Sequence, residues 1–146
     1  MASPCKESCS NIMGMIMTQK QRVFISFDFD NDESQRNLLV GQSKNEDVPF
    51  SFEDWSVKAH MTGDWVAKVT TKIRSVDQVI VLCGRHTHLS DGISKELEIA
   101  RQEKKPYFLL GAYNDNACTL PRSAAPHDKI YKWSWDNIRL LLRGSR

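Results

Sequence analysis

Short apolar runs alternate with amphipathic stretches along the chain after residue 20. Three of these runs are rich in β-branched and aromatic residues without polar alternation, which predicts buried strands at Arg22–Phe27, Val79–Cys83 and Pro106–Gly111. Unbroken apolar strands are typical of a parallel sheet that is covered on both faces. Two shorter strands are expected at Pro49–Glu53 and Lys129–Tyr131.

The stretches between these strands have the period of amphipathic helices. Trp65, Val69 and Ile73 recur at positions i, i+4 and i+8 and predict a helix over Gly63–Ser75. Three other helices are expected: one at Glu33–Gln42, one that Ser90 and Asp91 can cap and whose apolar stripe runs to the basic EKK segment at residues 103–105, and one after Ser134 that includes Leu142. Because strands and helices alternate, the sequence predicts an α/β fold with an open, mostly parallel sheet and helices on both faces. A long surface loop is expected over residues 112–128.

Length and composition narrow the class of protein. The chain has 146 residues and a mass of 16.7 kDa, which is the size of one ordinary domain. With 40% hydrophobic and 26% charged residues it is neither low-complexity nor disordered. The net charge of +2 is too small for the basic stripe of a nucleic-acid-binding protein. Residues 121–146 hold six Lys or Arg and two Asp or Glu, a surplus of +4 that suits contacts between subunits or with a partner.

The N-terminal residues, the length of the apolar runs and the cysteines bear on the cellular compartment of the protein. Residues 1–20 are interpreted as a flexible N-terminal extension before a single domain at 21–146. No apolar run approaches the roughly 20 residues of a membrane helix, so no membrane contact is expected. The four cysteines form neither a CxxC pair nor a disulfide framework, which favours a reducing cytoplasm.

Polar residues gather in three loops that follow predicted strands. In sheets of this kind ligands bind beyond the carboxyl ends of the strands, where the strand order reverses. The loops concerned are 28–32, 54–63 and 84–91. None contains a GxGxxG or P-loop motif, so a dinucleotide dehydrogenase or an NTPase is not indicated. His86 and His88 have no carboxylate or thiolate beside them in sequence, and no metal site is expected.

Glu96 is the most informative single position. It lies three residues after Ile93 and four before Ala100, at the border of the apolar stripe of its helix. A carboxylate there can face the crevice at the carboxyl ends of the strands. The alternative is a solvated helix residue, like Glu98 and Glu103.

Three segments carry a resemblance to a known family. They are RVFISFDFDND, FSFEDWSV and VIVLCGRHTHLSDGISKELEIARQEKKPYFLLG. In this order they resemble the Toll/interleukin-1 receptor (TIR) superfamily over some 125 residues, from Arg22 to the last helix. The nearest likeness is to compact bacterial TIR-like proteins, including the TIR component of the Thoeris anti-phage system.

The resemblance implies a flavodoxin-like, three-layer αβα sandwich with five mostly parallel strands. It also implies that Asp54–Gly63 is the mobile loop of the family. Glu96 falls on the glutamate with which active TIR domains cleave NAD, which makes it the catalytic candidate. Many active TIR domains carry an aromatic residue a few positions earlier, where this chain has Gly92 and Ile93.

The implied activity is cleavage of the nicotinamide–ribose bond, with NAD as substrate and no separate cofactor. The product would be a nucleotide of the ADP-ribose or cyclic ADP-ribose type, and Glu96 would stabilise the positive charge that develops on the ribose. The expected substrate-binding residues are Phe27, Asp28, Phe29, Asp54, Trp55, Ser56, Arg85, His86 and Thr87. Phe27 is equally well explained as a core residue, and Asp28 as a cap of the following helix.

Two other functions stay open. The first is a non-catalytic TIR adaptor that self-associates through the Asp54–Gly63 loop and the helix at Ser90. The second is an enzyme like the nucleoside deoxyribosyltransferases, which also use a glutamate at an N-glycosidic bond. For the catalytic hypothesis, the expected partners are NAD, further copies of the chain and an effector that senses the nucleotide product in anti-phage defence.

Overall fold

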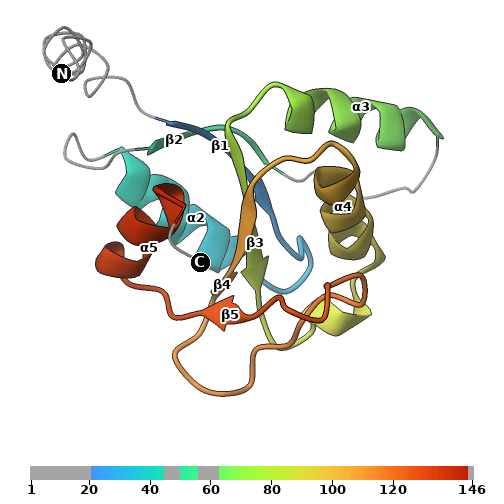
Figure 1. Cartoon of the computed structure of the whole chain (residues 1–146). Helices are drawn as coiled ribbons and strands as arrows, with labels where there is room; N and C mark the ends of the chain where they lie inside the picture. The colour runs from blue at the N-terminus through green and yellow to red at the C-terminus, as the bar shows by residue number, and fades with distance from the viewer. Residues whose placement is uncertain (1–20, 45–49, 56–62, 145–146) are drawn as a thin grey trace, which may run out of the picture.

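The protein is described here by a computed structural model in which residues 21–44, 50–55 and 63–144 are placed (Figure 1). The predicted extension at residues 1–20 lies outside the described residues and stays a prediction. The elements in chain order are β1 (Gln21–Ser26), α2 (Glu33–Ser43), β2 (Phe50–Trp55), α3 (Gly63–Arg74), β3 (Gln78–Cys83), the 3-10 helix η1 (Thr87–Leu89), α4 (Asp91–Gln102), β4 (Tyr107–Gly111), β5 (Ile130–Tyr131) and α5 (Trp135–Leu142).

The five strands form one parallel sheet. Their order is β2-β1-β3-β4-β5, and each neighbouring pair is parallel. This confirms the predicted α/β fold with a five-stranded parallel sheet. The chain first adds β2 on one side of β1 and then returns to add β3 on the other side. The strand order therefore reverses between β1 and β3, which is the usual place of a ligand crevice.

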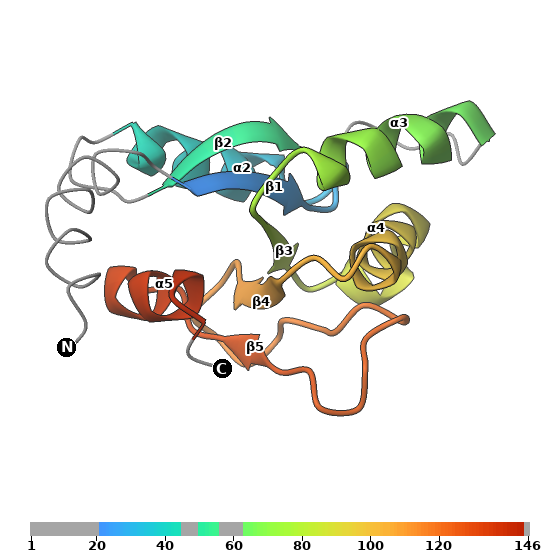
Figure 2. The same cartoon turned by 45° about the horizontal axis from the view of Figure 1, so that its top comes forward.

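Helices cover both faces of the sheet, as expected of a three-layer sandwich. In Figures 1 and 2, α2 and α5 lie on one side of the strands and α3 and α4 on the other. The residues of β1 alternate between the two cores: Val23 and Ile25 pack toward α2 and α5, and Phe24 packs toward α3 and α4. All six residues of β3 are buried, so both of its faces are covered. The burial of both faces explains why Val79–Cys83 is an unbroken apolar run.

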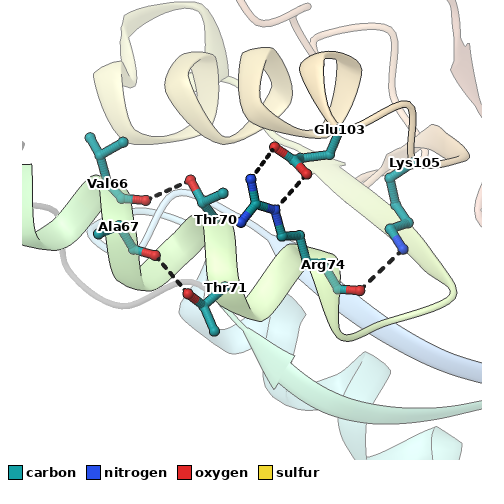
Figure 3. A network of polar contacts seen from close by, with 7 residues as sticks. All are labelled: Val66, Ala67, Thr70, Thr71, Arg74, Glu103 and Lys105. Carbon is teal, nitrogen blue, oxygen red and sulfur yellow. Dashed lines mark hydrogen bonds and ion pairs between the residues drawn. The ribbon is translucent and has the colours of Figure 1, made fainter.

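A polar network joins the ends of α3 and α4 on the outside of the molecule (Figure 3). Arg74 donates from Nε and Nη2 to the two carboxylate oxygens of Glu103, at 2.7 and 3.2 Å. The same contact lowers the pKa of Glu103 below its usual range. Lys105 Nζ donates to the carbonyl oxygen of Arg74 at 3.3 Å. Because the Arg74 side chain is exposed, this network orients the two helices more than it stabilises the fold.

The element boundaries agree with the predicted ones to within about two residues, and one element was not predicted. The 3-10 turn Thr87–Leu89 forms because Thr87 Oγ1 accepts a hydrogen bond from Gly84 N at 2.7 Å and so closes the loop after β3. No helix among the described residues is long and apolar enough to cross a membrane.

Replacing a side chain at the centre of the sheet should destabilise the fold strongly. Ile80 lies in β3 and is fully buried in the core formed with α2 and α5. Ile80→Ala should lower the free energy of unfolding by about 2–5 kcal/mol, because the cavity cannot collapse between two layers. Urea denaturation followed by circular dichroism measures this. Leu38→Ala, at a side chain that is 56% exposed, should change it by less than about 0.5 kcal/mol. Equal losses in both variants would contradict the packing described here.

Candidate functional site

Three loops meet at the carboxyl ends of the central strands. They follow β1 (residues 27–32), β3 (residues 84–90) and β4 (residues 112–119). Backbone hydrogen bonds connect the loop after β4 to the end of β3 and the loop that follows it: Thr119 N donates to Gly84 O at 2.9 Å, and Ala112 N donates to Cys83 O at 2.8 Å. The crevice predicted at the strand reversal is therefore bounded by loops that hold one another in place.

Glu96 lies beneath these loops, on the face of the sheet covered by α3 and α4. Ser90 caps the start of α4 by accepting a hydrogen bond from Ile93 N at 3.1 Å. Glu96 lies one helical turn after Ile93. Its side chain is 1% exposed, and Ser26 Oγ donates to Glu96 Oε1 at 2.6 Å. The alternative of a solvated helix residue is therefore wrong: Glu96 is a buried carboxylate fixed to the last residue of β1.

Ser26 carries no role in the sequence-based prediction, although the sequence holds a signal for it. It is the single polar residue within the apolar run from Val23 to Phe27. Buried hydroxyl groups almost always have hydrogen-bond partners. A hydroxyl in such a strand therefore indicates a polar group on a facing element, here the carboxylate of Glu96 on α4.

The predicted substrate-binding residues Phe27, Asp28 and Phe29, which follow β1, do not share one environment. Phe27 is buried in the core with α2 and α5, on the opposite face of the sheet from Ser26, and its ring lies 5.7 Å from that of Phe29. Asp28 accepts hydrogen bonds from Asp30 N at 3.1 Å and from Asn31 Nδ2 at 2.7 Å. The Asp28 side chain thus stabilises the turn that directly follows it, while Asp32 occupies the N-cap position of α2 without a capping hydrogen bond to its side chain.

Asp32 is buried at this edge as well, like Glu96 and Asp28, and the prediction gave it no role. Its side chain is 1% exposed, and Tyr113 Oη donates to Asp32 Oδ1 at 3.1 Å. Burial raises the pKa of Asp32 above its usual range, and the nearby Asp28 adds to the effect. A Cβ atom on Gly84 would overlap both carboxylate oxygens of Asp32, so this close approach requires glycine. Asp32 therefore joins the loops after β1, β3 and β4.

Arg85 lies at the outer rim of the same loops. Its guanidinium carbon is 4.1 Å from the ring centroid of Tyr113, and its Nη2 atom donates to Asp115 Oδ2 at 2.5 Å. The Arg85 guanidinium holds the pKa of Asp115 below its usual range. A phosphate that binds Arg85 must compete with Asp115, which the sequence-based prediction did not include because it placed residues 112–128 in a plain surface loop.

The remaining predicted residues differ in how much the structure says of them. Thr87 is fully buried, and its hydroxyl oxygen accepts a hydrogen bond from Gly84 N, whereas His86 is exposed at the rim.

The predicted residues at the end of β2 are described through their backbone. Asp54 and Trp55 end this strand, and their backbones pair with Phe24 and Ile25 of β1. Ser56 lies outside the described residues. The substrate-binding roles of Asp54, Trp55 and Ser56 stay predictions.

Two further observations describe the surroundings of the site. Within the described ranges, no group of three or more His, Cys, Asp or Glu side chains could hold a metal ion. A cavity of about 320 Å³ lies beside the loop after β4, lined by Tyr113, Asp115, Cys118 and Tyr131 among others. Its size is at the lower end for small-molecule sites.

The contact between Gly84 and Asp32 can be tested by adding one methyl group. Gly84→Ala should lower the free energy of unfolding by about 1–3 kcal/mol, because the new Cβ must displace the buried carboxylate. Chemical denaturation measures the change. In Gly41→Ala no atom lies within 4 Å of the new Cβ, and this control in α2 should stabilise the fold by up to about 1 kcal/mol. A neutral Gly84→Ala variant would show that the loops do not meet as described.

The raised pKa of Asp32 also predicts how stability depends on pH. A raised pKa means that the folded chain binds the proton more tightly than the unfolded chain, so stability falls as pH rises through the raised pKa. Asp32→Asn removes this contribution. The wild type should therefore gain stability relative to Asp32→Asn when urea denaturation is moved from pH 7 toward pH 4. A constant difference between the two proteins over this range would contradict the burial of an ionisable Asp32.

Comparisons with known proteins agree with this architecture. A solved structure described as "Crystal Structure of a prokaryotic SEFIR domain" is similar in fold, with a TM-score of 0.50 and 16% sequence identity over 85% of this chain and 94% of that chain. None of the curated proteins matches. A family profile described as "Thoeris protein ThsB, TIR-like domain" matches residues 24–117, which include Ser26, Asp32 and Glu96. This match covers more than half of the chain, and the protein belongs to the family of Thoeris ThsB TIR-like domains.

Proposed function

We propose that the chain consumes NAD by cleaving the bond between nicotinamide and ribose, with Glu96 as the catalytic carboxylate. The observation that carries the proposal is the buried Glu96 beside Ser26, at the carboxyl edge where the strand order reverses. Burying a carboxylate is costly, and a purely structural role at this position could be filled by an apolar side chain. Membership of the Thoeris ThsB family supports the same assignment.

The proposed reaction needs one carboxylate and no second reagent other than the acceptor. The C–N bond breaks with its electron pair leaving on the nicotinamide nitrogen, and positive charge develops on the ribose ring. Glu96 stabilises this charge electrostatically, as carboxylates do in glycosidases. Attack by water gives ADP-ribose and a proton, whereas attack by a ring nitrogen of the adenine in the same molecule gives a cyclic ADP-ribose isomer.

The other predicted residues take parts that fit their surroundings. Arg85 and His86, at the rim, are proposed to bind the pyrophosphate, with Arg85 exchanging Asp115 for the substrate. Asp28, Phe29 and the end of β2 at Asp54–Ser56 are proposed to border the mouth of the site. Phe27 and Thr87 support the site from within, because both are buried.

Access to Glu96 requires a local movement. Since its side chain is 1% exposed, the ribose reaches it only after the surrounding surface opens. We propose that association of several copies of the chain favours the open state. The nucleotide product would then act as a cytoplasmic signal, sensed by an effector in anti-phage defence.

A non-catalytic adaptor is the second candidate, and the same burial favours it. A carboxylate that is closed off from solvent and bonded to Ser26 can serve to fix α4 on β1. In that case the surface of the domain would act through self-association alone, and no bound NAD would be turned over.

An isosteric change at Glu96 separates the two candidates. Glu96→Gln should keep the fold and the contact to Ser26 but lower the rate of nicotinamide release from NAD by at least about 100-fold, because the negative charge is lost. The matched control is Glu98→Gln, two residues along α4, where the side chain is 45% exposed. It should retain the wild-type rate. Both variants are assayed over a range of protein concentrations that includes the assembled state.

The outcomes of this assay are distinct. Equal turnover by Glu96→Gln and wild type would remove Glu96 from the mechanism. If the wild type shows no turnover at any concentration, while light scattering shows that it assembles, the adaptor is favoured.

A further inference from the structure

A second cavity lies at the other end of α4, where β4 begins. It has a volume of about 780 Å³, within the range of small-molecule sites. Its lining comes from the end of α4, the first half of β4 and the segment that leads into β5. We name it the basic cleft, after five of its lining side chains: Arg101, Lys104, Lys105, His127 and Lys129.

In the described part of the chain, the positive charges of the basic cleft outnumber the carboxylates that interact with them, which are Asp128 and Glu103. Lys105 Nζ and Arg101 Nη1 donate to backbone carbonyls, which leaves their positive charge in place (Figure 3 shows Lys105). The carboxylate that lines the cleft is Asp128, which accepts hydrogen bonds from Tyr107 Oη at 2.8 and 2.9 Å and from Ala125 N. His127 Nε2 also lies 3.8 Å from Asp128 Oδ1, the charge of Lys105 helps to lower the pKa of Glu103, and Lys129 Nζ lies 5.0 Å from the ring centroid of Tyr131. Arg101, Lys104 and Lys129 are the lining cations for which the described residues supply no carboxylate partner.

Basic residues at the end of a helix have a simple structural explanation, which does not cover the whole cleft. Arg101 lies in the last turn of α4, and Lys104 and Lys105 follow the carbonyl end of this helix, where positive charge is favourable. His127 and Lys129 belong to a segment more than 20 residues further along the chain and cap no helix end. The convergence of both groups on one cavity is what an anionic ligand requires.

The backbone of Lys104 gives an independent observation. Its φ angle is 56°, in the left-handed region, and it directly follows Glu103, the C-cap residue of α4. Helices usually place glycine at this position, because a side chain there is strained. A lysine in place of glycine costs stability, and such strained positions are often retained for function.

We propose that the basic cleft binds a small molecule with two or more linked phosphates, such as the polyphosphate end of a nucleotide. Adjacent phosphates carry multiple charges, which the cations of Arg101, Lys104 and Lys129 can neutralise, and lysine binds phosphate as a point charge. The apolar floor at Phe108 and Leu109 limits water around the ligand. The cleft is separate from Glu96, and this inference does not depend on NAD cleavage.

The test uses isothermal titration calorimetry of the full chain at low ionic strength with inorganic pyrophosphate, ATP and adenosine. Pyrophosphate and ATP should bind, adenosine should not, and affinity should fall as salt is added. Lys104→Gly and Lys129→Ala should each weaken binding of pyrophosphate by about three- to tenfold. Lys104→Gly should at the same time raise the melting temperature of the free protein, because it relieves the strained φ angle.

Two controls locate the binding. Lys68→Ala removes an exposed charge on α3 outside the cleft and should change the affinity by less than twofold. Arg85→Ala removes the cation proposed to bind the pyrophosphate of NAD, and it should bind inorganic pyrophosphate like the wild type, which separates the basic cleft from the proposed active site. Absence of binding to the wild type, or an equal loss in Lys68→Ala, would overturn the proposal. Unchanged binding in both Lys104→Gly and Lys129→Ala would overturn it as well.

Discussion

The burial of β3 on both faces is the constraint on which the rest of the structure depends. Every side chain from Gln78 to Cys83 is enclosed between two helical layers, so polar chemistry is excluded from the middle of the sheet. Ionisable groups can lie only where the strands end. The same enclosure raises the pKa of the Cys83 thiol and makes it a packing residue rather than a nucleophile. The carboxyl edge therefore collects the polar side chains that face the crevice.

Asp32 and Glu96, the two least exposed of the three buried carboxylates at that edge, have different surroundings. Asp32 touches Gly84 and receives a bond from Tyr113, and so it holds three loops together. Glu96 is bonded to Ser26 at the end of β1 and sits on a helix that packs against the sheet. The first arrangement explains why the loops keep their shape. The second places a carboxylate on rigid elements, which is what a reaction that depends on precise charge placement requires.

The sequence predicted the strands and helices, whose apolar positions recur at regular spacing. It did not predict the side chains whose positions depend on contacts between loops far apart in the chain. The strands and helices follow from apolar runs and from stripes such as Trp65, Val69 and Ile73, because both patterns report burial directly. Tyr113 and Asp115 could not be found this way: they lie in a polar stretch, and their roles arise from side chains more than 25 residues away. Asp32 was visible as a loop carboxylate, but its burial depends on a glycine 52 positions further on, a contact that no local pattern encodes.

The burial of Glu96 strengthens its proposed chemistry and restricts it at the same time. In a medium that excludes water, a carboxylate stabilises a developing positive charge more than it would in solvent. The same enclosure keeps substrate out, so any opening must leave Glu96 charged and oriented. Ser26 meets this requirement because it belongs to β1, which is paired on both sides by β2 and β3 and cannot move with a loop. In the proposed mechanism β1 and α4 therefore keep the carboxylate in place, and the movement that admits the substrate belongs to the surface around them.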